Sequence, residues 1–253
     1  MDPDAVAYIA AVEAADGQTL ETATKIAINQ FVKGCKADPS PTPGVSNFQA
    51  IKASCILAGA RTLAGALVPL KGTAPTNVGF TAPDYNRRTG LKGTGSAYLN
   101  SNRNRNSDPQ NNSHICAYRT QPETTGARVL IGAGNTAGQA GATQIRLGTG
   151  SSYTRHTSDG ADLFSADGLP AGFVGISRSN STSYSRRLPG STGLITNDTQ
   201  LPVNAGFFIF TSSNLVGISD ARISFYSIGE AVDLTALDAR VTALMAALAV
   251  AIP

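Results

Sequence analysis

Hydrophobic positions in the first part of the chain recur with the spacing of amphipathic helices. The pattern predicts one helix over residues 4–17, which an aspartate caps and a glycine ends, and a second over residues 19–34. A loop rich in Pro and Ser follows at residues 36–47. Apolar and small residues at positions 48–70 predict a third helix. Residues 1–72 are therefore predicted to form a helical segment.

Beyond that segment, helical spacing gives way to short apolar or alternating runs separated by Gly, Asn, Ser, Asp and Pro. This texture predicts an antiparallel β-sandwich. In residues 206–211, apolar side chains fall on both faces of the pleat, so we expect a central strand covered on both sides. The candidate strands are residues 98–99, 114–119, 128–131, 143–147, 172–177, 183–187, 206–211 and 221–226.

The last segment again has helical spacing, and its apolar seam repeats at intervals of three and four residues. Such a seam has two interpretations: it packs the helix onto its own sandwich, or it joins several chains in a short coiled coil. The seam spans barely two heptads, which favours self-packing, because sustained coiled coils need three or four. The seam consists of Leu234, Leu237, Val241, Leu244 and Leu248.

The fold class is thus mainly β, with a helical N-terminal part and a C-terminal helix. Three parts are predicted: a helical docking segment (1–72), a β-sandwich (73–230) and an amphipathic helix (231–253). Composition agrees, because charged residues make up only 15% of the chain, against about 25% in typical soluble domains. Gly, Ser, Thr, Asn and Ala fill the difference, which favours strands joined by many turns.

Charge and cysteine content exclude several classes of function. A net charge of +3 is too small and too dispersed to predict nucleic-acid binding. The acidic N-terminus lacks the basic region of a signal peptide. The apolar stretch 51–70 contains Lys52 and Arg61, so no membrane insertion is expected. Cys35, Cys55 and Cys116 form no CxxC pair, so we expect buried free thiols and a reducing cytoplasm during folding.

Candidate catalytic groups are few. His114 lies at the start of a predicted strand, two residues from Cys116 and on the same strand face, whereas His156 is expected in a loop. No GxSxG motif accompanies the many serines. A pair on one strand face is more often packed than reactive, so no catalytic residue is assigned and the chain is expected not to be an enzyme.

One acidic cluster, of Asp159, Asp162 and Asp167, leaves alternatives open. Two carboxylates can perform glycosidase chemistry, and carboxylate oxygens can bind Ca²⁺. The spacing does not match an EF-hand loop, and Asp-Gly steps are typical of solvated turns. No metal or cofactor site is assigned, and Ca²⁺ remains the alternative.

A basic region carries Arg87, Arg88, Arg103 and Arg105, with Tyr85, Tyr98 and Tyr118 interleaved. Guanidinium groups bind carboxylates and phosphates, so this region could face an acidic sugar or another anionic ligand. The alternative interpretation, which we favour, is a solvated face rich in Arg and Asn.

Three stretches resemble a family of bacteriophage virion structural proteins of tail-fibre type. They are residues 11–38 together with 51–80, the segment DYNRRTGLKGTGSAYLNSNRNRNSDPQNNSHICAY, and the segment DARISFYSIGEAVDLTALDARVTALMAAL. Members of this family carry a helical segment followed by a concanavalin A-like (laminin G-like) jelly-roll sandwich. The middle stretch resembles the first strands of such a domain, and FYSIGE resembles its closing strand.

The resemblance implies a structural role in a virion assembled from chains made in the host cytoplasm. A tail fibre or tail tip that contacts the host surface is the leading hypothesis. The implied partners are other virion proteins, further copies of the chain, with a trimer favoured, and a host-surface glycan. The alternatives are a capsid decoration protein (head fibre) and a jelly-roll protein that binds or processes glycans.

Overall fold

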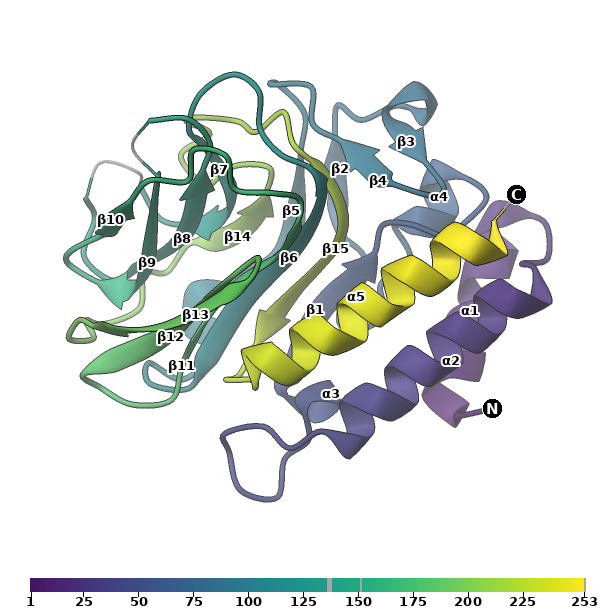
Figure 1. Cartoon of the computed structure of the whole chain (residues 1–253), viewed down its shortest axis with the longest axis horizontal. Helices are drawn as coiled ribbons and strands as arrows, with labels where there is room; N and C mark the ends of the chain where they lie inside the picture. Colours follow the sequence, from purple (N-terminus) through teal and green to yellow (C-terminus); the bar gives the residue numbers. More distant parts are fainter. Residues whose placement is uncertain (136–137, 151, 253) are drawn as a thin grey trace.

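The computed structural model describes residues 1–135, 138–150 and 152–252. Two antiparallel sheets face each other. A layer of helices covers one of them, on the face that points away from the other sheet (Figure 1). The helices are α1 (Pro3–Asp16), α2 (Thr22–Ala37), α3 (Asn47–Ala50), α4 (Leu63–Ala66) and α5 (Leu234–Ala251), with 3₁₀ turns η1 (Ala82–Asp84) and η2 (Arg105–Ser107).

We call the sheet next to the helices the inner sheet and the other the outer sheet. In the described part of the chain, the inner sheet has eight strands in the order β13-β12-β11-β6-β15-β4-β3, with β1 also paired to β15. Its strands are β1 (Ile51–Ile56), β3 (Tyr85–Asn86), β4 (Gly90–Lys92), β6 (Ser113–Gln121), β11 (Gly172–Arg178), β12 (Ser183–Leu188), β13 (Ser191–Thr196) and β15 (Arg222–Gly229).

The outer sheet runs in the order β10-β9-β8-β7-β14-β5-β2. All pairings in both sheets are antiparallel, which confirms the predicted sandwich. Its strands are β2 (Thr76–Val78), β5 (Tyr98–Asn104), β7 (Arg128–Ala133), β8 (Ala142–Leu147), β9 (Ser152–Ser158), β10 (Asp162–Phe164) and β14 (Gly206–Ile209).

Two hydrophobic clusters hold the three layers together. One fills the space between the sheets, and the other joins the inner sheet to the helices. Strand β15 contributes to both, because Tyr226 points between the sheets while Phe225 meets Phe31 of α2 edge to face at 5.6 Å. The doubly covered central strand is therefore β15. The expectation that residues 206–211 are covered on both sides is wrong, because Phe208 of β14 points away from the core and is only half-buried.

The predicted third helix is also wrong. Only two four-residue helices, α3 and α4, form there. A reciprocal box of Ser46 and Gln49 caps α3, and at Ile51 the backbone becomes extended and enters β1. Strand β1 pairs with β15 from Ile51 to Ile56. It lies between the helices and the other sheet, so both of its faces are apolar and its pattern is ambiguous between helix and strand. Residues 1–72 thus include a strand of the sandwich, so the predicted boundary at residue 72 does not separate helices from sheet.

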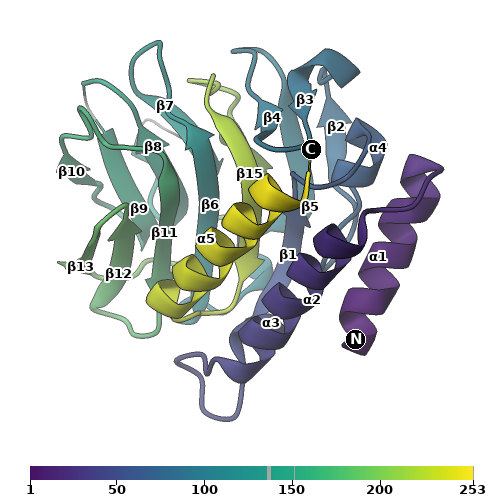
Figure 2. The same ribbon diagram turned by 45° about the vertical axis from the view of Figure 1, so that its right-hand side comes forward.

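The C-terminal helix lies across the inner sheet, beside α2 (Figure 2). Asp233 caps it, accepting hydrogen bonds from the backbone N–H groups of Thr235 and Ala236. The predicted seam packs within the chain, because all five of its residues are buried against α2 and the sheet; they are Leu234, Leu237, Val241, Leu244 and Leu248. By length and composition α5 could also cross a membrane, but helices that cover a protein core share these properties.

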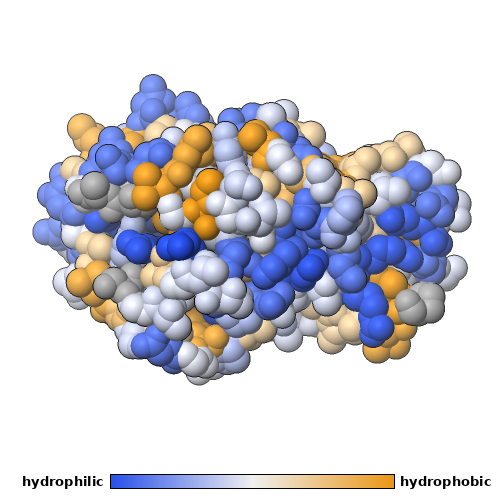
Figure 3. All heavy atoms as spheres, turned by 90° about the horizontal axis from the view of Figure 1, so that it is seen from above, coloured by the Kyte–Doolittle hydropathy of each residue, from blue (hydrophilic) through white to orange (hydrophobic). Residues whose placement is uncertain are grey.

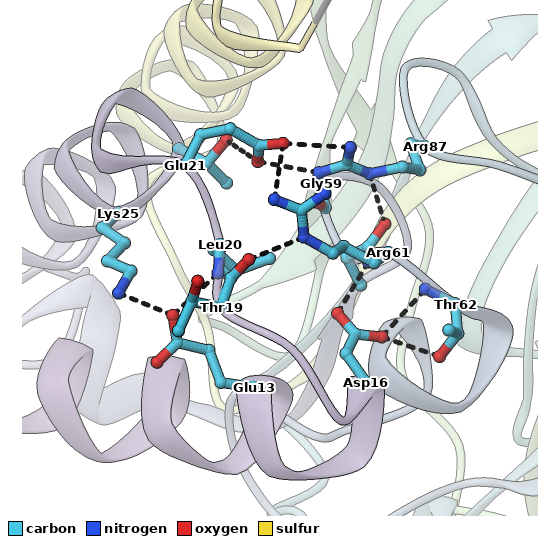
Figure 4. Close-up of polar contacts among 12 residues, drawn as sticks. Glu13, Asp16, Thr19, Leu20, Glu21, Lys25, Gly59, Arg61, Thr62 and Arg87 are labelled. Atoms are coloured by element: carbon cyan, nitrogen blue, oxygen red, sulfur yellow. Dashed lines mark hydrogen bonds and ion pairs between the residues drawn. The ribbon is translucent and has the colours of Figure 1, made fainter.

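A polar network fixes the corner between α1 and α2 to the sandwich (Figure 4). The buried carboxylate of Asp16 accepts hydrogen bonds from the backbone N–H groups of Arg61 and Thr62, at 2.6 and 2.8 Å. Glu21 forms ion pairs with Arg61 and Arg87 at 3.0 and 2.8 Å. The Arg87 guanidinium lowers the pKa of Glu21 to about 2. The helix layer is therefore part of the same folded unit as the sheets.

Candidate functional site

In the part of the chain that the structure describes, no helix lies on the face of the outer sheet that points away from the inner sheet; we call it the distal face (Figure 1). Side chains alternate along a strand. Since Leu99, Ile145 and Ile209 lie in the core between the sheets, their neighbours in sequence point to the distal face. The distal residues of the central strands are Tyr98, Asn100, Phe208, Gln144, Arg146, Tyr153 and Arg155.

One end of the distal face is an aromatic–amide patch on β5 and β14, made of Tyr98, Phe208, Asn100, Asn104 and Gly206. The rings of Tyr98 and Phe208 stack with centroids 5.3 Å apart and planes 10° from parallel. Asn100 lies opposite Phe208, and Asn104 lies opposite Gly206. A Cβ at Gly206 would lie 3.2 Å from the Phe208 ring and 3.7 Å from both carboxamide oxygens. The glycine therefore allows the ring and the two carboxamides to lie close together.

The other end is an arginine patch on β8 and β9, made of Arg146, Tyr153, Arg155 and Gln144. Both guanidinium groups lie 5.7 Å from the centroid of the Tyr153 ring, within the range of cation–π attraction. The Tyr153 hydroxyl donates to Gln144 Oε1 at 2.8 Å, and Gln144 Nε2 donates to the carbonyl of Gly134 at 3.0 Å. Burial raises the pKa of Tyr153, so its hydroxyl remains a donor at neutral pH.

A loop separates the two patches. Ser212 follows β14 and lies over Gly132 of β7, where a Cβ would come within 3.3 Å of the Ser212 Cβ. Ser213 Oγ accepts a hydrogen bond from the Gly134 N–H at 2.8 Å and holds the loop in place. The rings of Tyr98 and Tyr153 lie on strands four positions apart in the sheet, a span of about 19 Å at the usual strand spacing.

The predicted basic region does not form one surface. Arg87 belongs to the network at the helix corner, and Arg88 donates to the Ala249 carbonyl of α5. Arg103 is paired with Asp108, with its Nε 2.9 Å from Oδ2. Arg105 is fully buried. The interpretation of Arg105 as a solvated or ligand-facing residue is therefore wrong.

Arg105 belongs to a polar cluster inside the sandwich that the sequence did not reveal. Its guanidinium donates to Thr143, Thr157 and Ser113, at 3.0, 2.7 and 2.7 Å. Burial lowers the pKa of Arg105 to about 10. The neighbouring Arg178, also fully buried, donates from Nη2 to the carbonyls of residues 156 and 197, both at 2.9 Å. These arginines join loops to the sandwich interior by hydrogen bonds, and their burial makes them inaccessible to ligands.

Both histidines are structural. His156 lies in β9 and not in a loop, and its Nε2 donates to the Ser113 carbonyl at 2.9 Å. His114 and Cys116 share a strand face, as predicted, and both contact Ser227 Oγ, at 2.5 and 3.4 Å, beneath the helix layer. Burial lowers the pKa of His114 to about 4 and raises that of the Cys116 thiol to about 12. A reactive thiolate–imidazolium pair is disfavoured there.

All three cysteines are buried and free, which confirms the expectation of buried free thiols. The three aspartates of the predicted acidic turn make separate contacts. Asp162 pairs with Arg186 across the open edge of the sandwich, and Asp167 accepts from the Gly150 N–H at 3.3 Å. Asp159 is exposed. Among the described residues, no group of three or more His, Cys, Asp or Glu side chains could hold a metal ion.

No protein-family model and no curated protein sequence matches the chain. Solved structures match its fold. Trypanosoma rangeli sialidase in complex with sialic acid has a TM-score of 0.52 and 10% identity, over 85% of this chain and 37% of the sialidase. The binding domain of botulinum neurotoxin serotype D has a TM-score of 0.50 and 12% identity, over 77% of this chain and 51% of that one.

The chain thus spans about half or less of the length of these structures. At such low identity the likeness establishes the fold alone. The fold is a jelly-roll β-sandwich of the concanavalin A-like type with added helices, which confirms the fold that the sequence resemblance implied.

The buried histidines make stability depend on pH. In the unfolded chain a histidine has a pKa near 6.5, whereas in the folded protein burial lowers the pKa of His114 to about 4 and that of His156 in the same direction. The unfolded state therefore binds more protons over this range. The stabilisation that the neutral buried imidazoles contribute is complete above about pH 6.5, and it is lost as the pH falls through about 4.

Between pH 7 and pH 4, we expect the free energy of unfolding of the His114→Gln variant to fall by about 3 kcal/mol less than that of the parent. Urea unfolding of both proteins at several pH values measures this difference. The acidic residues are common to both proteins, so their contribution cancels in the comparison. An equal loss of unfolding free energy in the two proteins would contradict the assignment of a neutral buried imidazole.

Proposed function

We propose that this chain is a non-catalytic recognition module that binds a glycan on the distal face. One observation carries the proposal: a stacked aromatic pair and two asparagine side chains lie together on the sheet face that the helices leave uncovered. Ligand sites combine apolar and aromatic surface with a few placed polar groups. Half-buried rings give the apolar face of a sugar a surface to stack on, and carboxamides can hydrogen-bond its hydroxyl groups.

A binding role is favoured over glycan processing by the placement of the titratable groups. Glycosidase chemistry uses two carboxyl groups facing one bond. On the distal face, the described residues of the aromatic–amide patch are neutral, and the acidic turn makes separate structural contacts. The histidines and cysteines lie in the cores. The fold alone supports neither choice, because one fold hosts many functions.

A second proposal concerns where the module is mounted. We propose that it belongs to a bacteriophage particle, as a tail-fibre or tail-tip component, or alternatively as a head decoration protein. The sequence resemblance supports this placement. The architecture is suited to it, because the helix layer lies on the opposite side of the molecule from the distal face (Figure 1). The helices could attach to sister chains, in a trimer for a fibre, while the distal face meets the host surface.

The loop end of the sandwich is a less suitable glycan surface. Seen from above, the hydrophobic residues lie in small separate groups among hydrophilic ones (Figure 3). Leu215 and Val216 are among the exposed apolar residues of this loop region.

The proposed binding is tested with the variants Tyr98→Ala and Phe208→Ala. We expect each to weaken binding of an oligosaccharide, selected on an array of immobilised neutral and acidic glycans, by about tenfold. Isothermal titration calorimetry gives the affinity, and thermal melting confirms folding. Leu194→Ala, which removes an exposed side chain from β13 of the inner sheet, is the control and should bind normally. Unchanged affinity in both aromatic variants would contradict the proposal.

The proposed placement is tested by imaging intact particles and locating the chain in the density. Density at the tail or baseplate would support a fibre, and regularly spaced density over the head would support a decoration protein. Absence of the chain from purified particles would contradict both.

A further inference from the structure

The arginine patch carries positive charge that no described acidic residue balances. Seven arginines elsewhere in the described chain have a carboxylate oxygen within hydrogen-bonding distance; they are Arg61, Arg87, Arg103, Arg119, Arg186, Arg187 and Arg240. Arg146 and Arg155 have none among the described residues. Arg146 Nε donates only to the Ala127 carbonyl, at 3.3 Å. Two guanidinium groups beside one ring repel each other unless an anion joins them.

Arg155 adds a second, independent observation. Its side chain lies on the distal face, yet the residue is only 5% exposed. Its Nη1 approaches the Gln139 carbonyl at 3.5 Å, and its buried Nε has no partner among the described residues. Buried polar groups in native proteins are almost always hydrogen-bonded. The Arg155 guanidinium therefore has unused hydrogen-bonding capacity, as has the interior Arg119 at its Nε.

The patch is held rigid before any ligand binds. The Tyr153 ring positions both guanidinium groups, and the chain of hydrogen bonds from Tyr153 through Gln144 to Gly134 positions the ring. Beside them, on β10, Leu163 lies opposite Tyr153 and is 69% exposed. The patch thus offers fixed N–H donors next to a small apolar surface, which suits an anionic group attached to a sugar ring.

We infer that Arg146 and Arg155 form a subsite for the carboxylate of an acidic sugar within the glycan that the distal face binds. This inference rests on the proposed function and names the chemical class of its ligand. The carboxylate oxygens accept hydrogen bonds from the partly exposed Arg146 guanidinium, the buried guanidinium of Arg155 adds positive charge beside it, and the sugar ring lies toward Leu163. A neutral part of a long or branched glycan then reaches the aromatic–amide patch, on the other side of the Ser212 loop.

The test compares probes whose carboxyl groups are either free or esterified. Trigalacturonate and sialyllactose are each compared with their methyl esters by titration calorimetry with the full chain. We expect the charged member of at least one pair to bind about tenfold or more tightly. That preference should shrink as salt concentration rises.

Variants locate the charge preference. Arg146→Gln and Arg155→Gln should each remove it, and Arg146→Lys, which keeps the charge but not the planar fork, should retain part of it. Arg128→Gln is the matched control. Arg128 also lacks a carboxylate partner but lines a hollow at the loop end, so its loss should leave the preference intact. Arg146 is partly exposed, so the Arg146→Gln variant keeps the test valid if the Arg155 variant fails to fold.

The outcomes separate this inference from the proposed function. Equal binding of charged and neutral probes, abolished by Phe208→Ala but not by the arginine variants, would overturn the carboxylate subsite and leave the glycan-binding proposal standing. A charge preference that survives both arginine substitutions would also overturn the subsite. Absence of binding to every glycan tested would overturn both.

Discussion

The architecture depends on the burial of the inner sheet between two apolar layers. Strand β15 shows the constraint most clearly, because Phe225 packs under the helices and Tyr226 packs toward the outer sheet. A strand buried on both faces needs a cover on each side, and α2 and α5 supply the second cover. The helices thereby occupy one side of the molecule. The distal face of the outer sheet is left as the broad surface that no helix covers.

Polar residues inside the sandwich show how a chain with few charges stabilises its loops. Arg105 and Arg178 are fully buried and bind hydroxyl and carbonyl oxygens in place of carboxylates. Each one joins segments that are distant in sequence, so the ends of the strands stay fixed. The distal arginines differ from them, because the hydrogen bonds of Arg146 and Arg155 to backbone carbonyls are long, at 3.3 and 3.5 Å.

Much of the fold could be predicted from the sequence. The helices α1, α2 and α5 and most of the longer strands follow directly from periodicity. Strand β1 could not be predicted, because burial on both faces removes the alternation that marks a strand. Strand β9 was missed for the opposite reason. Its inward residues Thr154 and His156 are polar and serve the internal cluster, so the segment has the composition of a loop.

The candidate site was less accessible to sequence reasoning. Tyr98 and Phe208 are far apart in the chain, and only the order of strands in the outer sheet places them side by side. Arg146 and Arg155 are close in sequence, but the sequence does not show that they share a face. They do so because β8 and β9 pair in one register. A cluster of arginines in the sequence, by contrast, proved to be dispersed over the helix corner, an ion pair and the interior.

The central claim is that the distal face is the ligand-binding surface, and mapping amide chemical shifts during titration with an oligosaccharide tests it most directly. The account predicts that the shifts concentrate on β5, β14, β8 and β9, around Phe208 and Tyr153, and leave the helix layer unchanged. Shifts confined to the groove between α2 and α5, or to the loop end of the sandwich, would contradict it.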